Sequence, residues 1–394
     1  MTFPKRCTFL ILFYSFLMYS AQPATAPHAI TYELSGVGYR LGNNIYTYSA
    51  TKWLAYKYNL QFYFSPFGYS NYFVMSEKEP RLTPHLKNSY KKIVVIKSES
   101  ELIEHLKESQ KPTLFVTQFP LYCLVPTTLK KFKCFARNDR RELIYFFMRQ
   151  NYQFGNDLTE NLMLKPQYQS ILPTPHLPPK KIITVAVHIR KGSFLDTPTE
   201  SMQYFDENKR SLHDNQSSKS TQADGPYSKP IDKLFPLTFP PEQFFLDQIK
   251  KLSALLDHPP LFVYIFTDDK HPDHIVKRLE KRLTQKNIFF ACAEGEFPYQ
   301  KNVIADLYAM SLFDCLIKPG SFYSWISQML GAHNIIIFPQ STTWINNKML
   351  TINDVGIILY DHNTRKTDYF SFNKITEELK RKALNLFKNR QINF

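Results

Sequence analysis

One segment of this chain, residues 185–193, reads Val-Ala-Val-His-Ile-Arg-Lys-Gly-Ser. Its apolar first part predicts a central strand of a parallel sheet that is covered on both faces. Ligands of open α/β sheets bind just beyond the carboxyl ends of such strands. Arg190 at that place is suited to hold a phosphate group through its planar fork of donors. A strand that ends in a solvated basic loop is the competing interpretation.

Strand and helix patterns alternate regularly around this segment. We expect strands at 182–189, 261–266, 287–291, 314–318 and 334–338, with helices at 242–256, 274–283, 302–313 and 322–330 between them. This order predicts a doubly wound parallel sheet. A less regular alternation precedes it, with strands at 30–34, 60–64, 93–96 and 113–116 and helices at 43–58 and 140–153. The fold class is therefore α/β, in two halves.

Breaks in composition divide the chain. Its 394 residues, 43% of them apolar, are enough for two cores. The Pro-rich linker 173–181 separates an expected N-terminal domain, 27–172, from a C-terminal domain, 182–394. Within the latter, the polar segment 197–233 is expected to be a mobile insertion. A basic amphipathic helix at 375–389 either docks on the fold or contacts a membrane, and docking is favoured.

The first 26 residues have the layout of a targeting element. Lys5 and Arg6 precede an apolar run that extends to about Met18, followed by small residues. This pattern predicts a signal peptide or, if it is not cleaved, a signal anchor. In either case we expect the body of the protein to be exported or to face a lumen or the periplasm.

The net charge of +15 favours anionic ligands or surfaces. The basic clusters at 130–133, 277–282 and 380–382 are short and dispersed, and none contains a nucleic-acid-binding signature. We therefore expect no nucleic-acid partner.

Three further segments contain residues suited to chemistry. The glycine-rich turn 36–44 would let backbone approach a ligand at a helix start, although Asn43 as a plain N-cap explains it equally. The pair of acids at 268–269 would bind a divalent metal or cap the next helix, and capping is favoured. Asp306 would hydrogen-bond the donor edge of a purine, and the turn at 320–321 would donate N–H groups to phosphate. A solvated Asp306 and an N-cap at Ser321 are the alternatives.

Taken in order, these segments resemble the fucosyltransferases that use GDP-fucose, most closely the alpha-1,2-fucosyltransferases of glycosyltransferase family 11. Five motifs of that family correspond in order: G-x-L-G-N-Q to 38–44, H-x-R-R-x-D to 188–193, Ser/Thr-Asp-Asp to 267–269, D-x-x-x-[ML]-[ST] to 306–311 and G-[ST]-F-x-x-W to 320–325. The resemblance covers roughly 36–60 and 182–340. Lys191 replaces the second arginine of the motif and Ser193 replaces its terminal acid.

The resemblance implies a GT-B-like fold, in which two Rossmann-type domains enclose a donor cleft, and a reaction without metal or other cofactor. It implies transfer of fucose from GDP-fucose to a sugar hydroxyl, with inversion, and an alpha-1,2 linkage to galactose as the expected case. Two alternatives stay open. One is a secreted glycan- or nucleotide-sugar-binding protein of the same fold without catalysis, and the other is a transferase that uses a different GDP-sugar.

The resemblance also assigns roles by position. Arg190 would bind the β-phosphate and neutralise charge as GDP leaves. With Ser193 in place of the motif's acid, Asp196 and Glu200 are the nearest candidates for the base that takes the acceptor proton, and Asp196 is preferred. The remaining expected donor-binding residues are His188, Lys191, Arg40, Asn43, Asp306, Ser321, Phe322 and Ser324. Of these, His188 and Asp306 would recognise the guanine and ribose.

Overall fold

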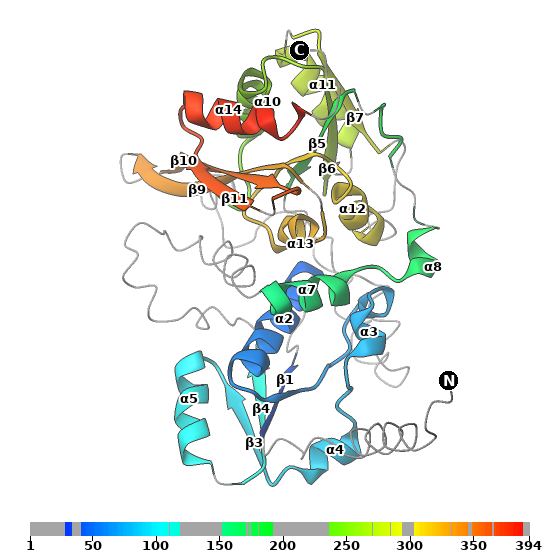
Figure 1. The fold of residues 1–394 in the computed structure, drawn as a ribbon, viewed down its shortest axis with the longest axis vertical. Coiled ribbons are helices and arrows are strands. Elements are labelled where there is room, and N and C mark those ends of the chain that lie inside the picture. The colour runs from blue at the N-terminus through cyan, green and yellow to red at the C-terminus, as the bar shows by residue number, and fades with distance from the viewer. Residues whose placement is uncertain are drawn as a thin grey trace, which may run out of the picture. The chain divides into compact units, whose positions relative to one another are not determined.

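The computed structural model describes residues 28–33, 41–109, 111–118, 152–170, 172, 175–179, 181–191, 236–269, 271–283, 285–293, 303–331, 333–345, 349–364 and 366–388. They form two compact units, each built on a sheet of its own (Figure 1). The expected targeting segment 1–26 and the insertion 197–233 lie outside the described residues.

The first unit contains a four-stranded sheet in the order β2-β1-β4-β3. Its strands are β1 (His28–Glu33), β2 (Gln61–Phe62), β3 (Lys92–Ile96) and β4 (Thr113–Gln118), and all neighbours are parallel. The helices α4 (Pro84–Ser89) and α5 (Glu99–Glu108) and most of α2 (Leu41–Lys57) belong to this unit. Ser98 defines the start of α5, because its hydroxyl accepts the N–H of Glu101 at 3.2 Å.

The second unit contains a seven-stranded sheet in the order β11-β10-β9-β8-β5-β6-β7. Its five parallel strands are β5 (Ile183–Ile189), β6 (Leu261–Thr267), β7 (Ile288–Cys292), β8 (Cys315–Ile317) and β9 (Ile335–Ile345). Numbered along the chain, these five strands have the order 3-2-1-4-5 of a Rossmann fold. The order reverses between β5 and β8, which makes this boundary the topological switch point of the sheet.

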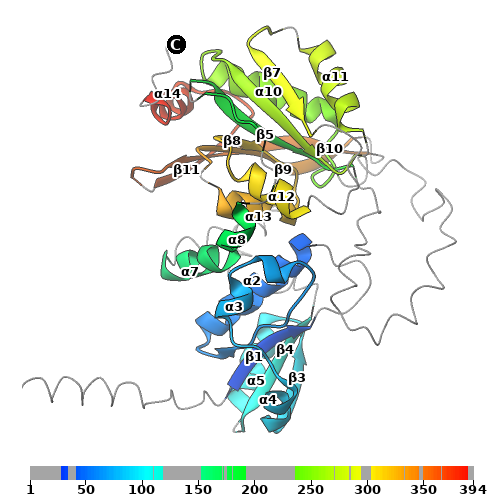
Figure 2. The ribbon, with the colours of Figure 1, turned by 90° about the vertical axis from the view of Figure 1, so that its right-hand side faces the viewer.

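Helices cover both faces of this sheet (Figures 1 and 2). The helices α10 (Glu242–Leu255), α11 (Pro272–Arg282) and α14 (Glu377–Asn385) pack on one face, and α12 (Val303–Met310) and α13 (Phe322–Leu330) pack on the other. Side chains of a strand alternate between faces. Accordingly, Val185 and Val187 of β5 join the core under α10, whereas Ala186 joins the core under α12.

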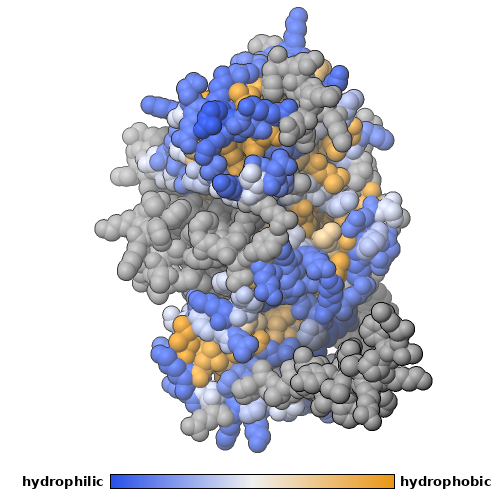
Figure 3. All heavy atoms as spheres, in the orientation of Figure 1, coloured by the Kyte–Doolittle hydropathy of each residue, from blue (hydrophilic) through white to orange (hydrophobic). Residues whose placement is uncertain are grey.

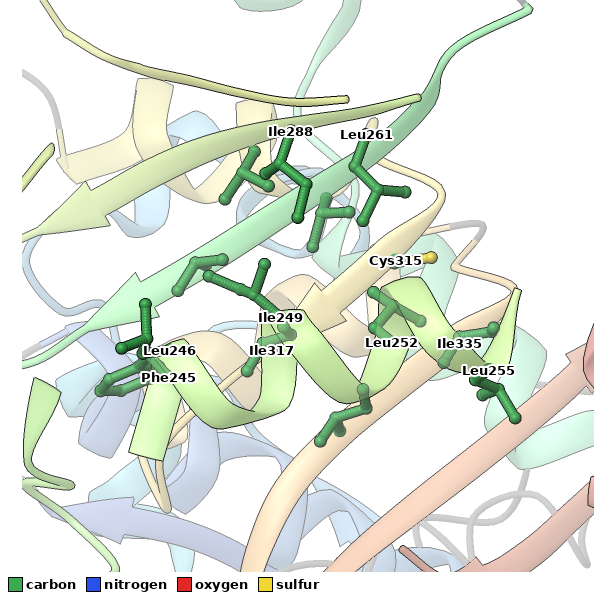
Figure 4. Close-up of a cluster of buried hydrophobic side chains, with 14 of the residues drawn as sticks. Phe245, Leu246, Ile249, Leu252, Leu255, Leu261, Ile288, Cys315, Ile317 and Ile335 are labelled. Carbon is green, nitrogen blue, oxygen red and sulfur yellow. The ribbon is translucent and has the colours of Figure 1, made fainter. Parts of the chain in front are cut away.

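The larger core lies between α10 and the sheet. Figure 4 shows one side of α10 facing the strands of the sheet, with its apolar side chains at helical spacing. The labelled side chains are Phe245, Leu246, Ile249, Leu252 and Leu255 of α10, with Leu261, Ile288, Cys315, Ile317 and Ile335 of the strands. The burial of this apolar surface is the main force that holds α10 on the central strands.

A buried polar contact joins the central strands at their amino ends. The carboxylate of Asp314 accepts the backbone N–H and the hydroxyl of Thr184, each at 2.9 Å, and the Asp314 N–H donates to the Thr184 hydroxyl at 3.0 Å. Both residues are buried. The contact aligns β5 with β8 in the register Val185 to Cys315.

The α/β class and the parallel sheets are confirmed, and each predicted strand of the second unit has a counterpart. The prediction ended the last strand at 338, but β9 continues through Pro339 and forms an antiparallel edge with β10 (Met349–Asp361) and β11 (Lys366–Ser371). Pairing with β10, which includes an irregularity near Asp354, extends the strand beyond its apolar part.

The preferred docking of the basic C-terminal helix is confirmed. Leu379 and Ala383 of α14 and the following Phe387 are buried in the core under α10. Lys380 contacts Asp257 at 2.5 Å, and Lys382 contacts Asp368 at 3.0 Å. In Figure 3 the surface over α14 is hydrophilic, as expected for a helix that buries its apolar side. No described helix has the length and apolarity needed to span a membrane.

The two units do not divide at the Pro-rich segment. Residues 36–46 and 66–78 group with the second unit, as do α3 (Met75–Lys78), α7 (Tyr152–Leu162) and α8 (Pro166–Gln169). Most of the helix predicted at 140–153 lies outside the described residues, and the described helix in this region is α7.

Asp314→Ala tests the contact between the central strands. The change leaves two buried donors of Thr184 without their acceptor, so we expect the free energy of unfolding to fall by about 3 kcal/mol. Urea unfolding measures it. The control is Asp273→Ala, which removes an exposed acid that pairs with Lys277 at 3.0 Å and is expected to have a much smaller effect on stability. Equal losses in the two variants would contradict the interpretation.

Candidate functional site

Four side chains form a row across the carboxyl edge of the second sheet. His188 pairs in register with Phe266, and Val187 pairs with Ile317, which pairs with Ile337. Lys318 and Phe338 are the next residues along their chains, so the row reads Phe266, His188, Lys318, Phe338. It lies on the face covered by α12 and α13, and its centre is the switch point between β5 and β8.

His188 is a neutral imidazole in this row. It is 6% exposed, and burial, reinforced by the positive charges of Arg190 and Lys318, lowers its pKa to about 3. Its ring lies 5.5 Å from the ring of Tyr323, between centroids, and its Nδ1 has no hydrogen-bond partner in the described part of the chain. A neutral His188 is a hydrogen-bonding group at physiological pH and not a general acid.

Arg190 lies at the same edge. Its guanidinium carbon is 4.9 Å from the ring centroid of Phe239, a cation–π contact. The segment that contains Phe239 is fixed beside the switch point, because the Leu237 carbonyl accepts the N–H of Gly320 at 2.6 Å. Arg190 is thus connected, through Phe239, to the segment that hydrogen-bonds the turn between β8 and α13, and its expected contact with phosphate stays a prediction.

The turn between β8 and α13 uses its hydroxyl groups to begin the helix. Ser321 is the N-cap of α13, and its Oγ accepts the N–H of Tyr323 at 3.3 Å. The Ser324 hydroxyl donates to the Ser321 carbonyl at 3.2 Å. Phe322 packs on Tyr46 with 4.3 Å between ring centroids. These contacts support the structural alternative for Ser321, and the expected donor-binding roles of these residues stay predictions.

The start of α2 packs against the start of α13. A Cβ added at Gly42 would lie 2.8 Å from the backbone nitrogen of Tyr323 and 3.1 Å from Cβ of Phe322. The glycine of the predicted turn is thus required by the close approach of the two helices. Asn43 lies within α2, which begins at Leu41, so its interpretation as the N-cap was wrong. Arg40 lies outside the described residues.

Asp306 is a half-buried acid in the first turn of α12. Burial raises its pKa to about 7. No hydrogen bond or ion pair to its carboxylate is found within the described ranges. Tyr323 connects the first turn of α12 with the row of side chains on the sheet. Its hydroxyl donates to the Val303 carbonyl at 2.5 Å, and its ring contacts His188. An ionisable group of this kind near a ligand-binding edge is typical of a functional site.

Lys191 lies on the opposite face of the sheet from this row. Its Nζ is 2.6 Å from Glu242 Oε1 at the start of α10, and Arg278 Nη2 contacts the same oxygen at 2.7 Å. The Arg278 hydrogen bonds and then those of Lys191 lower the pKa of Glu242 to about 2. The structure thus places the Lys191 ammonium against α10, and its expected role in donor binding stays a prediction.

The two acids after β6 have separate structural contacts. Asp268 accepts the backbone N–H of Lys191, and Asp269 Oδ1 accepts the N–H of His271 at 2.9 Å. The following helix, α11, has His271 as its N-cap without a side-chain cap, so the predicted capping role was wrong in detail. Among the described residues, no group of three or more His, Cys, Asp or Glu side chains is placed to hold a metal.

Sequence reasoning assigned no role to Lys318, Phe239 or Tyr323. Lys318 was detectable as a charged residue at the end of an apolar strand, two residues after the buried Leu316. Phe239 and Tyr323 are aromatic residues in a sequence with 33 Phe and 24 Tyr, and no local signal distinguishes them. The expected base, Asp196, lies outside the described residues.

No family model matches the chain, and no curated protein matches it by sequence. Among solved structures, a mutant of FUT1 from Arabidopsis thaliana in complex with GDP is similar to this chain, with a TM-score of 0.43, 13% identity and coverage of 82% of this chain and 73% of the other. The fucosyltransferase NodZ from Bradyrhizobium gives a TM-score of 0.35, 10% identity and coverage of 84% and 99%. NodZ alpha-1,6-fucosyltransferase co-crystallised with GDP gives a TM-score of 0.34 and 11% identity, with coverage of 84% of this chain and 98% of the other.

Gly42→Ala tests the contact between α2 and α13. In a helix without this contact, alanine is more stabilising than glycine by about 1 kcal/mol. Here the added methyl group meets backbone, so we expect the free energy of unfolding to fall by ~1–3 kcal/mol. The sign of the change, measured by urea unfolding, decides the question. Stabilisation would show that the two helices do not pack as described.

Asp306→Asn tests the buried acid. The unfolded chain has the ordinary pKa of 3.8 and the folded state about 7. Between these values the folded state holds a proton that the unfolded state lacks. The contribution to stability is therefore full below pH 3.8 and is lost as the pH rises through 7, by up to ~1.4 kcal/mol per pH unit.

The asparagine of this variant cannot ionise, so the loss disappears. Because the side chain is only half-buried, we expect the free energy of unfolding of the variant to exceed that of the wild type by ~2 kcal/mol at about pH 8. At about pH 4 we expect the two values to be equal. Denaturant unfolding at the two pH values measures the difference. Asp314→Asn serves as the control. It replaces a carboxylate whose oxygen accepts two hydrogen bonds from Thr184, so it should destabilise the protein at the higher pH. Destabilisation by Asp306→Asn under those conditions would contradict the prediction.

Proposed function

We propose that the second unit binds the diphosphate of GDP-fucose at the switch point between β5 and β8, and that the protein transfers fucose to a sugar hydroxyl. One observation carries the proposal: Arg190, held by Phe239, lies beside the turn before α13 at the edge where Rossmann sheets bind nucleotides. The guanidinium fork matches phosphate oxygens, and the turn ends at a helix N-terminus, which favours anions.

Recognition of guanine is assigned to His188 and Asp306. Guanine presents adjacent N–H donors on one edge, and a carboxylate is their natural acceptor. The raised pKa of Asp306 means that burial disfavours its ionised form. Donors from a base would compensate the charge and return the carboxyl to its ionised form. The neutral His188 would complement it as a hydrogen-bonding partner.

The proposed transfer step is an inverting displacement at C1 of fucose. The bond between fucose C1 and the β-phosphate oxygen breaks, and its electron pair leaves with GDP. The acceptor hydroxyl oxygen bonds to C1 from the opposite face, which inverts the configuration, and its proton passes to Asp196. Arg190 stabilises the charge that develops on the β-phosphate, which is the contribution that would make a metal unnecessary. Galactose with an alpha-1,2 linkage is the acceptor that the sequence motifs favour.

Two other functions are compatible with the same site. Ser193 stands where the fucosyltransferase motif has an acid, and this favours a glycan- or nucleotide-sugar-binding protein without catalysis. The described residues at the switch point are assigned to the nucleotide and not to the sugar, so another GDP-sugar is the second alternative. The N-terminal pattern supports a body that is exported or anchored at a membrane.

Thermal unfolding with GDP, GDP-fucose, GDP-mannose and UDP-galactose tests the donor site. A ligand at about 100 times its dissociation constant stabilises the folded state by ~2.7 kcal/mol. We expect this stabilisation with GDP and GDP-fucose, and its loss in Arg190→Ala. Arg278→Ala is the matched control, because this arginine contacts Glu242 on the other face of the sheet. It should lower stability slightly and keep the response to ligand.

The outcomes separate the three functions. A response to GDP-fucose, followed by GDP release with galactosides, supports the transferase. A response without GDP release under any acceptor supports the binding protein, and an equal or larger response to GDP-mannose supports another donor. Failure of all four nucleotides to stabilise the wild type would overturn the donor site itself.

A further inference from the structure

The two consecutive cations that follow β5, Arg190 and Lys191, do not lie on the same face of the second sheet. Successive side chains point to opposite faces. In β5, Val185, Val187 and Ile189 join the core under α10, whereas Ala186 joins the core under α12, and His188 contacts Tyr323 of α13. The same alternation separates Arg190 from Lys191.

Lys191 is held on the face of α10 and α11. The Glu242 carboxylate accepts a hydrogen bond from the Lys191 ammonium at 2.6 Å. It also accepts two hydrogen bonds from Arg278, at 2.7 and 3.1 Å. The resulting low pKa keeps Glu242 ionised across the physiological range. Movement of Lys191 to the other face would break this ion pair and leave the partly buried carboxylate with one of its two cations.

A second cation does lie on the face of His188, in the neighbouring strand. Lys318 follows Ile317 in β8 and occupies the place beside His188 in the register of the sheet. It is 2% exposed, and its Nζ lies 5.3 Å from the ring centroid of Phe338. Its positive charge acts on His188 together with that of Arg190.

Arg190 is connected, through Phe239 and Leu237, to the turn that follows Lys318. Gly320 donates its N–H to Leu237, and Phe239, two residues later, lies under the guanidinium of Arg190. The two cations thus approach the switch point from adjacent strands, beside the N-terminus of α13. A diphosphate carries more than one negative charge, so two cations and a helix N-terminus together match it better than one arginine does.

We propose that Lys318, and not Lys191, is the second cation that binds the diphosphate of the nucleotide donor beside Arg190. The inference rests on the proposed function, because it names a further contact of the same site. The role that consecutive cations share in the sequence motif is divided here between two adjacent strands. Lys191 then has a structural role, in which it joins the end of β5 to α10 and α11.

Affinities for GDP and for guanosine test this assignment in the full-length protein. Guanosine lacks both phosphates, so the ratio of the two affinities isolates the phosphate contacts. In Lys318→Met we expect the ratio to fall about tenfold or more, the effect of one lost charged hydrogen bond. In Lys191→Met we expect a lower melting temperature with a ratio within about twofold of the wild type.

Lys251→Met is the matched control for the substitution itself. Lys251 belongs to α10, on the face opposite the site, and its Nζ also lies over a phenylalanine, 5.8 Å from the ring centroid of Phe372. Its ammonium donates to the Phe372 carbonyl at 3.2 Å. The substitution should leave the ratio unchanged. Lys318→Arg, which keeps the charge, should restore most of the preference for GDP.

Each outcome has one meaning. A ratio that falls in Lys191→Met and persists in Lys318→Met would overturn the assignment while leaving the donor site intact. Failure of the wild type to bind GDP would instead overturn the proposed function. If Lys318→Met does not fold, a crystal structure of the wild-type protein with GDP decides, because Lys318 Nζ must lie within hydrogen-bond distance of a phosphate oxygen.

Discussion

The placement of β5 between β6 and β8 is the constraint on which the rest of the second unit depends. Val185, Ala186 and Val187 are apolar and buried on both faces of the strand, so helices must cover both. At its amino end the reciprocal hydrogen bonds between Thr184 and Asp314 align β5 with β8. A slip by one residue would place every side chain of the strand on the wrong face. The same register places His188 beside Lys318 at the carboxyl end.

The close contact between α2 and α13 shows how a motif that suggests ligand binding can have a packing cause. Gly42 is in contact with the backbone of Tyr323, and Tyr46, one turn later, packs on Phe322. The ring of Tyr323 in turn contacts His188, and its hydroxyl donates a hydrogen bond to the Val303 carbonyl of α12. The geometry of the candidate site is thus determined by the packing of three helix starts as well as by the strand ends. Glycine is needed at position 42 whether or not a ligand binds there.

The sequence predicted the parallel sheet because apolar strands and amphipathic helices alternate from 182 to 338, and each needs the other to bury its surface. It did not predict β10 and β11, because Pro339 and the polar residues after it obscure a strand that is stabilised by its partner. For the candidate site, Arg190 and His188 were detectable from their place at the carboxyl end of a central strand. Lys318 was detectable as a charged residue at the end of an apolar strand, but its place beside His188 depended on knowing that β8 neighbours β5, which is a property of topology. Asn43 was misassigned because glycines before it suggested that the helix begins later than Leu41.

The electrostatics of the candidate site differs from that of the surface of the same unit. On the surface, opposite charges lie together, as in Lys380 with Asp257 or Arg278 with Glu242. At the switch point, a buried imidazole lies near two cations, and a half-buried carboxyl in the first turn of α12 has a raised pKa. Such local conflicts lower stability and persist where they serve a ligand. The signs of the groups agree with the proposed ligand class: cations lie at the edge where Rossmann sheets bind phosphates, and the carboxyl of Asp306 is the group proposed to recognise a base with N–H donors. A nucleoside diphosphate would complement both signs at once, which is why the charge arrangement at the switch point is itself an argument for the proposed donor.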